Sequence, residues 1–331
     1  MINIIIIVIC ILLFLSALLH FALDKKVKYD NLKGKHVVIT GGSSGIGKAS
    51  ALEASRLGAH VTIIGRDVEK LKTAVSEVKA KSLNNEQKIQ YAALDVTAGY
   101  DAIGKCLSSL EAEIGPIFML INSAGSCTCG QFENMKVDDI SQMMNLNYFG
   151  TAFATKYVLP GMKERKEGII VFVSSGAALL GIYGYSAYSG SKWAVRGLAE
   201  SLLMELVGTG VQLTLSFPPD TDTPGFEKEE LTKPEETKLI SGSAGLESAD
   251  NVGKQLVQDA LNGKTYSVCG LSGHIMSLLC CGSIDSVTQV LVQVCLMGPL
   301  RAVMVGILIS FQKIVKDGLK KKAMNETSKT K

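Results

Sequence analysis

A tyrosine and a lysine four residues apart are the side chains of this chain best suited to proton transfer. Tyr188 and Lys192 have the spacing that places both on one face of a helix. A nearby ammonium favours phenolate over phenol, so the pair predicts a Tyr188 pKa below the usual value of about 10. Tyr188 is therefore a candidate proton donor and acceptor, with Ser174 and Ser175 a little upstream. Tyrosine–lysine pairs with this spacing also occur on solvated helix faces, so the surrounding elements decide whether this pair is catalytic.

Those elements predict an α/β fold, a doubly wound parallel sheet of the Rossmann type, as a single catalytic domain over residues 35–265. Strands alternate with helices along this region, and ligands of such sheets bind at the carboxyl ends of the strands. Most of the polar motifs follow a predicted strand directly. Strands are expected at 35–40, 60–64, 117–121, 168–173 and 213–217, with a further strand ending at 94–96.

The first predicted strand leads into a glycine-rich turn that is typical of dinucleotide-binding proteins. The turn precedes a helix expected at 48–57, and its glycines would let the backbone approach a pyrophosphate. The positive end of the helix would stabilise that anion. The cofactor-binding positions expected here are Gly41, Ser43, Ser44, Gly45, Ile46 and Gly47.

The end of the second predicted strand favours NADPH over NADH. An acidic residue there would bind the ribose hydroxyls of NAD, whereas a guanidinium can bind a 2′-phosphate. Gly65 leaves the acidic position empty, Arg66 supplies a cation, and Lys70 follows one helical turn later. A solvated loop arginine is the alternative interpretation of Arg66. At the end of the third strand, Asp95 could accept a hydrogen bond from the adenine amino group.

The composition excludes some functions and places the apolar excess at the two ends of the chain. The chain has 331 residues with 47% hydrophobic and 20% charged residues, which suits one domain of about 250 residues plus appendages. A net charge of +3 is too small to predict nucleic-acid binding. The eight cysteines show neither zinc spacing nor a small disulfide framework, which indicates reduced thiols in a cytosolic compartment. Cys127 and Cys129 lack accompanying ligands, so no metal is predicted.

Residues 1–24 are expected to form a transmembrane anchor. Residues 2–23 carry no fixed charge and, at about 1.5 Å per residue, would cross a bilayer core of about 30 Å. A cleaved signal peptide is the alternative, although no Lys or Arg precedes the apolar run. The lysines that follow at once, Lys25, Lys26 and Lys28, place the next domain in the cytosol by the positive-inside rule.

Residues 270–312 form a second apolar region, which is expected to associate with the membrane. Asp285, Pro299 and Arg301 interrupt it, so it contains no uncharged span of about 20 residues. A membrane hairpin, two short spans or a membrane-bound substrate gate would fit, as would an amphipathic dimer or core helix. The basic tail, residues 313–331, would then lie in the cytosol.

Several motifs share one pattern: Thr40-Gly41-x-x-x-Gly45-x-Gly47, Asn122-x-Ala124-Gly125, Asn147, Ser175, Tyr188 and Lys192. Through them the chain resembles the short-chain dehydrogenases/reductases over residues 35–262. The resemblance implies that Tyr188 is the catalytic acid/base, and that Lys192 lowers its pKa and binds the nicotinamide ribose. It also implies that Ser175 orients the substrate carbonyl, with Ser174 as an alternative contact, and that Asn147 holds a water in a proton relay. Val96, Asn122 and Thr221 would contact the cofactor.

Two segments, 217–226 and 232–237, together with the apolar ends, resemble more closely the 3-ketodihydrosphingosine (3-ketosphinganine) reductase family. This resemblance implies NADPH-dependent reduction of the 3-keto group of a long-chain base to dihydrosphingosine, in sphingolipid biosynthesis. It places the enzyme in the endoplasmic reticulum membrane with its catalytic domain facing the cytosol. Residues 218–241 would form the substrate loop. Asp220 and Asp222 could meet the cationic 2-amino group of the substrate, or could cap the next helix or face water.

Two other functions remain open at this point. One is a membrane-bound reductase of steroid, retinoid or 3-ketoacyl thioester ketones. The other is a membrane scaffold that binds NADPH without turnover. The partners expected are a long-chain lipid ketone and the membrane, with no nucleic acid, and a homo-oligomer is compatible with these features.

Overall fold

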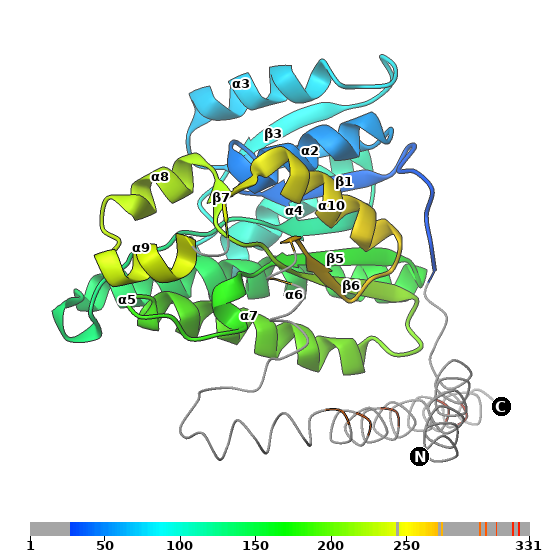
Figure 1. The fold of residues 1–331 in the computed structure, drawn as a ribbon. Helices are drawn as coiled ribbons and strands as arrows, with labels where there is room; N and C mark the ends of the chain where they lie inside the picture. The colour runs from blue at the N-terminus through cyan, green and yellow to red at the C-terminus, as the bar shows by residue number, and fades with distance from the viewer. Residues whose placement is uncertain are drawn as a thin grey trace, which may run out of the picture. The chain divides into compact units, whose positions relative to one another are not determined.

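The computed structural model describes residues 27–242 and 245–270, together with isolated positions further along the chain (Figure 1). The described residues 28–242 and 245–270 belong to the larger of two compact units. The expected anchor at 1–24, nearly all of the apolar region and most of the basic tail lie outside the described residues. Among the residues that are described, no helix is both long and apolar enough to span a membrane.

A seven-stranded sheet forms the centre of the larger unit, in the order β3-β2-β1-β4-β5-β6-β9 (Figure 1). Every neighbouring pair is parallel. The strand order reverses at β1, which pairs with both β2 and β4, so the ligand crevice is expected at the carboxyl ends of β1 and β4. The doubly wound parallel sheet is confirmed. Its strands are β1 His36–Thr40, β2 His60–Gly65, β3 Ile89–Ala93, β4 Ile117–Asn122, β5 Gly168–Val173, β6 Val211–Phe217 and β9 Tyr266–Val268.

The strands could be predicted from the sequence because most of them are buried on both faces. Every residue of β1, β4, β5 and β6 is buried, as expected for a parallel sheet covered by helices on both sides. The third strand is an exception, since β3 is only partly buried. It ends at Ala93, so the predicted strand end at 94–96 lies just beyond it. The short strand β9 was not predicted.

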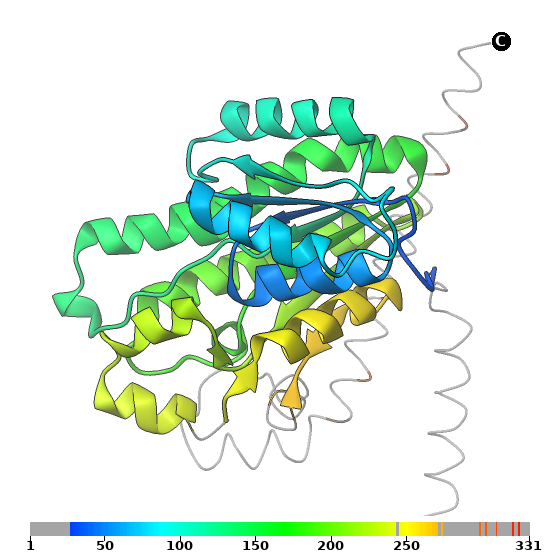
Figure 2. The same ribbon diagram turned by 90° about the horizontal axis from the view of Figure 1, so that it is seen from above.

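Helices cover both faces of the sheet, so the hydrophobic core consists of two clusters, one on each face (Figures 1 and 2). On one face, α2, α3 and α10 contribute residues such as Ala54, Leu71 and Leu256. On the other face, α4, α6 and α7 contribute residues such as Leu107 and Val158. These helices are α2 Gly45–Arg56, α3 Val68–Lys79, α4 Tyr100–Ile114, α6 Gly150–Arg165, α7 Ser186–Glu205 and α10 Ala249–Leu261.

The predicted substrate loop folds into short elements beyond the carboxyl end of β6. Strand β7, Thr221–Asp222, pairs with β8, Glu247–Ser248, and is followed by helices α8, Pro224–Glu230, and α9, Glu235–Gly242. Thr223 caps α8 by accepting a hydrogen bond from the Phe226 N–H at 3.0 Å. Figures 1 and 2 show α8 and α9 at the end of the sheet where the strands terminate, near α5, Val137–Met143. We refer to residues 218–242 as the cap segment.

Candidate active site

The predicted catalytic residues converge at the carboxyl end of β5 and the first turns of α7. Tyr188 and Lys192 both lie on α7, and Ser175 is the second residue after β5. The Lys192 ammonium is buried, donates to the Val173 carbonyl at 2.9 Å and lies 5.9 Å from the centre of the Tyr188 ring. A hydrogen bond between the Ser175 and Tyr188 side chains completes the arrangement. The Ser175 and Tyr188 hydroxyls are thus positioned to contact the carbonyl oxygen of a substrate.

The two neighbouring serines have different roles in the structure. The Ser174 hydroxyl is buried and donates to the Lys192 carbonyl at 3.1 Å, which ties β5 to α7. The Ser175 hydroxyl accepts from the Ala177 N–H at 3.1 Å and reaches Tyr188. The geometry therefore favours Ser175 as the serine beside the reacting atoms, and Ser174 as a link that holds α7 in place.

Asn147 lies in a π-helical turn, Met144–Phe149, that joins α5 to α6. Its amide exchanges hydrogen bonds with the Ser126 backbone, at 2.9 and 3.0 Å, and donates to the Ser191 hydroxyl at 2.9 Å. A Cβ on Gly125 would lie 3.1 Å from Asn147 Oδ1 and 3.3 Å from Lys192 Nζ, so this glycine preserves the close approach of the two side chains. Turns of this kind frequently occur at functional sites. The sequence indicated a helix here but not its widened turn.

The predicted fall in the Tyr188 pKa is wrong for this structure. Burial raises the pKa of Tyr188 well above its usual value, and the charge of Glu229 adds to the effect, while the Ser175 hydrogen bond opposes it. Lys192 does not reverse this rise, and burial lowers the pKa of Lys192 itself to about 8. Tyr188 is consequently a protonated phenol at neutral pH, which is the form that donates a proton to a developing alkoxide.

The buried lysine should make the cofactor-free protein more stable as the pH rises from about 8 to 10.5. The pKa of Lys192 is about 8 in the folded state against 10.5 for an exposed lysine, so in this window the unfolded chain binds more protons. The free energy of unfolding should therefore rise by about 3 kcal/mol over the whole pH window. Urea unfolding of wild type and Lys192→Met at several pH values measures it. A stability difference between the two proteins that does not change with pH would contradict the assignment.

The glycine turn has the shape required to receive a pyrophosphate. Gly41 and Gly45 have φ angles of +69° and +53°, in the left-handed region that favours glycine. A Cβ on Gly47 would lie 2.4 Å from the Gly41 carbonyl oxygen, so no side chain fits there. The α2 N-cap, Ser44, makes no side-chain capping bond, which leaves the positive end of the helix for an anion. These residues fit a dinucleotide.

The loops after β1 and β4 are tied together beside this turn. The Thr40 hydroxyl accepts from the Ser123 and Ala124 N–H groups, each at 3.2 Å. A Cβ on Gly41 would lie 2.8 Å from the Ala124 backbone, so the loops could not approach as closely with a larger residue. Asn122 is buried, and its amide donates to Thr155 at 3.2 Å, while its Oδ1 has no partner among the described residues.

The predicted phosphate-binding cations lie beyond the end of β2. Arg66 is 72% exposed and lies 3.7 Å from Asp95 Oδ2, and Lys70 lies in the first turn of α3. Although partial burial acts in the opposite direction, hydrogen bonds from Thr97 and the Arg66 charge lower the pKa of Asp95. The next residue, Val96, is buried. Two cations are therefore available where the adenosine end of a dinucleotide would lie in this fold.

One cap residue that the sequence analysis missed contacts the glycine turn. Thr221, which was predicted to bind cofactor, is buried and donates its hydroxyl to the Pro219 carbonyl at 2.8 Å. Thr223 instead lies against the turn, since its Cγ2 would be 2.9 Å from a Cβ placed on Gly45. No local motif distinguishes the two threonines, because the contact depends on how the cap segment folds back.

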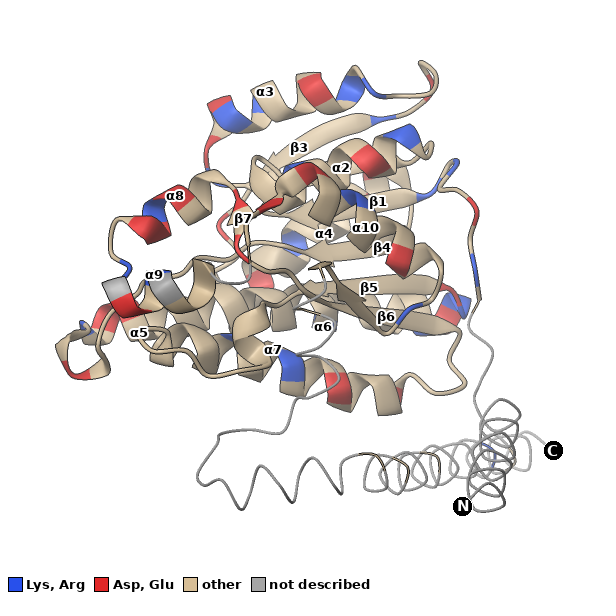
Figure 3. Cartoon of the chain, in the orientation of Figure 1, with Lys and Arg blue, Asp and Glu red and all other residues tan. Residues whose placement is uncertain are grey.

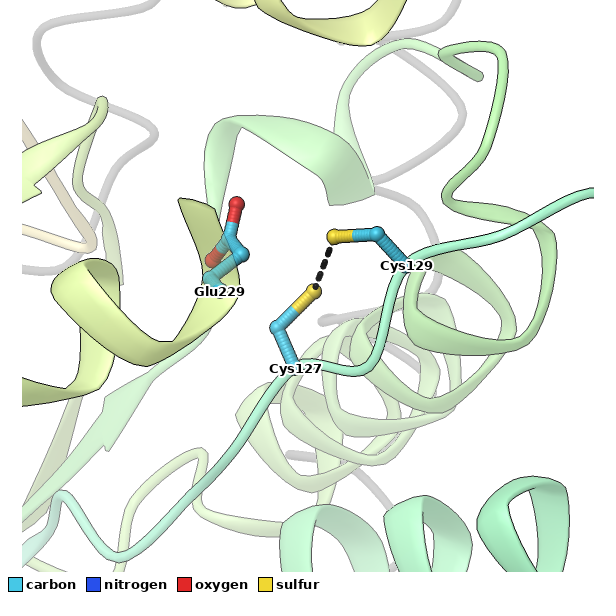
Figure 4. Close-up of side chains that lie close together, drawn as sticks. All are labelled: Cys127, Cys129 and Glu229. Carbon is cyan, nitrogen blue, oxygen red and sulfur yellow. Dashed lines mark hydrogen bonds between the residues drawn. The ribbon is translucent and has the colours of Figure 1, made fainter. Parts of the chain in front are cut away.

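A cluster around Cys127, Cys129 and Glu229 was also missed (Figure 4). The two sulfurs are 3.6 Å apart, and one ligand atom from each residue lies within 4.8 Å of the others. The expectation that no ligand accompanies the cysteines is therefore wrong in one respect, because the cap segment supplies Glu229. That carboxylate already accepts from the Tyr185 hydroxyl and pairs with Lys233 at 3.1 Å. Burial raises the pKa of Cys127, so its thiol stays protonated.

Comparisons with known proteins agree with this geometry. The family described as short chain dehydrogenase matches residues 35–234, which confirms the resemblance inferred from the motifs. The chain is 42% identical to 3-ketodihydrosphingosine reductase of Bos taurus over 89% of this chain and 90% of the relative. It is 43% identical to 3-dehydrosphinganine reductase of Danio rerio over 86% of each. A solved alcohol dehydrogenase from Thermococcus sibiricus, complexed with 5-hydroxy-NADP, is similar in fold, with a TM-score of 0.57, 23% identity and coverage of 66% of this chain and 87% of that one.

Proposed function

Because this chain belongs to the short-chain dehydrogenase family, we propose that its site reduces the 3-keto group of 3-ketodihydrosphingosine to dihydrosphingosine, a step of sphingolipid biosynthesis. The observation that carries this function is the identity of 42% over nearly the full length of a relative that bears this activity in its name. The structure supports it, since Ser175, Tyr188 and Lys192 lie together at the carboxyl end of β5, and Asn147 donates to the Ser191 hydroxyl of α7 beside them.

The residues of the site divide the work of ketone reduction. When bound, the nicotinamide cofactor supplies the hydride that is added to the ketone carbon. The Tyr188 hydroxyl donates its proton to the ketone oxygen as that oxygen gains charge, and the Ser175 hydroxyl hydrogen-bonds the same oxygen. The buried Lys192 ammonium is placed to hold the cofactor ribose and to stabilise the tyrosinate that remains. Asn147 holds the loop at Ser126 against α7, so that the site keeps its shape.

The cofactor is NADPH in this proposal, and Arg66 is the residue that selects it. Replacing Arg66 by alanine should weaken binding of NADPH by about 10- to 100-fold and leave that of NADH nearly unchanged, because a charge-assisted contact to the 2′-phosphate is lost. Binding titrations with both cofactors measure the ratio. Lys72→Met, on the exposed side of α3 where Lys72 pairs with Glu69 at 2.8 Å, is the matched control. Equal losses for the two cofactors would argue against a phosphate contact.

The proposal includes the endoplasmic reticulum membrane, with the catalytic domain in the cytosol. The uncharged stretch at 2–23 and the lysines after it support this placement. The substrate supports it too, because a long alkyl chain favours the bilayer by roughly 0.8 kcal/mol per buried methylene. In the described part of the chain, Leu231 and Val137, near the ends of α8 and α5, expose 84% and 75% of their surface and could face a lipid phase.

Intact microsomes from cells that express the chain provide the direct test. NADPH added without detergent should be oxidised on addition of 3-ketodihydrosphingosine, because the cofactor cannot cross the membrane and the site faces outward. Steroid, retinoid and 3-ketoacyl thioester ketones are assayed alongside. Activity on one of these with none on 3-ketodihydrosphingosine would contradict the proposed substrate, and activity that requires detergent would contradict the topology.

A further inference from the structure

A buried ammonium group lies in the cap segment. Lys233, between α8 and α9, has a side chain with no exposed surface. Its Nζ lies 3.3 Å from Asp220 Oδ2, 3.1 Å from Glu229 Oε1 and 2.6 Å from Glu230 Oε1. It also lies 4.4 Å from the centre of the Phe226 ring, close enough for a cation–π contact. Three carboxylates surround one cation, so the group carries an excess of negative charge, and Figure 3 shows acidic positions along α8 and beside β7.

Glu229 connects this cluster to the catalytic tyrosine. The Tyr185 hydroxyl donates to Glu229 Oε1, and the ring of Tyr185 packs edge-on against that of Tyr188 with 5.5 Å between centres. Cys127 packs against the same aromatic cluster, and Figure 4 shows the Glu229 carboxylate beside the two cysteine sulfurs. The charge of Glu229 also contributes to the raised pKa of Tyr188. A carboxylate of the cap segment is thus within electrostatic reach of the group that donates the proton.

We propose that Glu229 recognises the ammonium group of the sphingoid ketone, a role that rests on the function proposed above. In this substrate the amino group is on the carbon next to the ketone, so its nitrogen is two bonds of about 1.5 Å from the reacting carbon. When the ketone oxygen accepts from Tyr188, the ammonium must lie within a few ångströms of that hydroxyl. Glu229 offers the opposite charge in that neighbourhood, and Lys233 shows that the surrounding side chains accommodate an ammonium.

Burial and charge favour Glu229 over the two residues considered from the sequence. Asp222 is exposed on β7, and Asp220, which contacts Lys233 as Glu229 does, has a more exposed side chain, at 19%. The Glu229 side chain is only 13% exposed, so its attraction for a cation is less screened by water than that of a surface carboxylate. Because Lys233 neutralises only part of the negative charge, a second cation beside Glu229 would be stabilised rather than repelled.

Two ketones of equal chain length test the proposal, one with the 2-amino group and one without it. Glu229→Gln should lower kcat/KM for 3-ketodihydrosphingosine by about 10- to 100-fold, as expected for loss of a hydrogen bond to a charged group, with little change for the ketone without the amine. Glutamine retains an acceptor for the Tyr185 hydroxyl, and Lys233 keeps Asp220 and Glu230 as partners, so the fold should persist. Glu230→Gln, which removes a more exposed partner of Lys233, is the matched control and should discriminate like wild type.

The outcomes separate the role of Glu229 from the proposed function itself. Equal losses on both ketones in Glu229→Gln would mean that the residue only positions the cap segment, and would overturn the proposal. An unchanged preference for the amine in this variant would overturn it as well. If wild type binds cofactor but reduces neither sphingoid ketone, the proposed function fails, and the inference that rests on it falls for that separate reason.

Discussion

Replacing Tyr188 by phenylalanine should lower kcat by about 100- to 10,000-fold, the range expected for loss of a general acid. The variant removes one hydroxyl and keeps the ring that packs 5.5 Å from Tyr185, so the pocket should retain its shape. The proton that Tyr188 donates to the ketone oxygen would have to come from water. Turnover of 3-ketodihydrosphingosine and a binding titration with NADPH measure the two properties, and the affinity for the cofactor should stay within about threefold.

Tyr185→Phe is the matched control for this experiment. It removes the neighbouring hydroxyl, which donates to Glu229, and should cost far less turnover because that hydroxyl is not placed to protonate the ketone. The pair of variants also decides between an enzyme and an NADPH-binding scaffold. A scaffold would keep its cellular role in Tyr188→Phe, whereas an enzyme would lose that role while still binding cofactor.

Replacing Lys233 by methionine should lower the free energy of unfolding by about 3–5 kcal/mol, the usual cost of removing one partner from a buried ionic group. Although burial acts in the opposite direction, hydrogen bonding and charge from Glu230 and Glu229 raise the pKa of Lys233, so the wild-type side chain is charged at neutral pH. Methionine fills a similar volume but leaves three carboxylates facing one another without a cation. Urea unfolding at pH 7 measures the loss.

An exposed lysine on the preceding helix gives the control for this second prediction. Lys228→Met alters the same cap segment at a solvated position and should change stability by no more than about 0.5 kcal/mol. If Lys233→Met is as stable as wild type at pH 7, the prediction is wrong. The desolvation penalty of the buried ammonium would then equal the stabilisation from its ion pairs.

Several features of this protein could be predicted from the sequence because their physical causes are local. The strands that lie inside the sheet are buried on both faces, so their apolar runs stand out without knowledge of their neighbours. The glycine turn is recognisable because positive φ angles and backbone contact exclude other residues, as at Gly41 and Gly47. The spacing of Tyr188 and Lys192 follows from helix geometry alone. These local rules determined the fold class and the main candidate catalytic residues.

Other features depended on contacts that only the tertiary structure makes. The widened turn at Asn147 becomes recognisable once its amide meets Ser126 and Ser191. Thr223 reaches Gly45, and Glu229 reaches Cys127, because the cap segment folds back across the carboxyl end of the sheet. Positions more than a hundred residues apart in the chain carry no common pattern that would reveal such contacts.

The pKa of Tyr188 depends on both a local feature of the sequence and contacts that only the tertiary structure makes. The sequence by itself determined that a phenol and an ammonium lie one helical turn apart, and this spacing favours a lowered pKa. The tertiary structure decided the outcome, because packing of α7 and the cap segment removes water from both groups and brings Glu229 nearby. Desolvation depends on everything that surrounds a side chain, whereas a motif specifies only the few atoms that it contains.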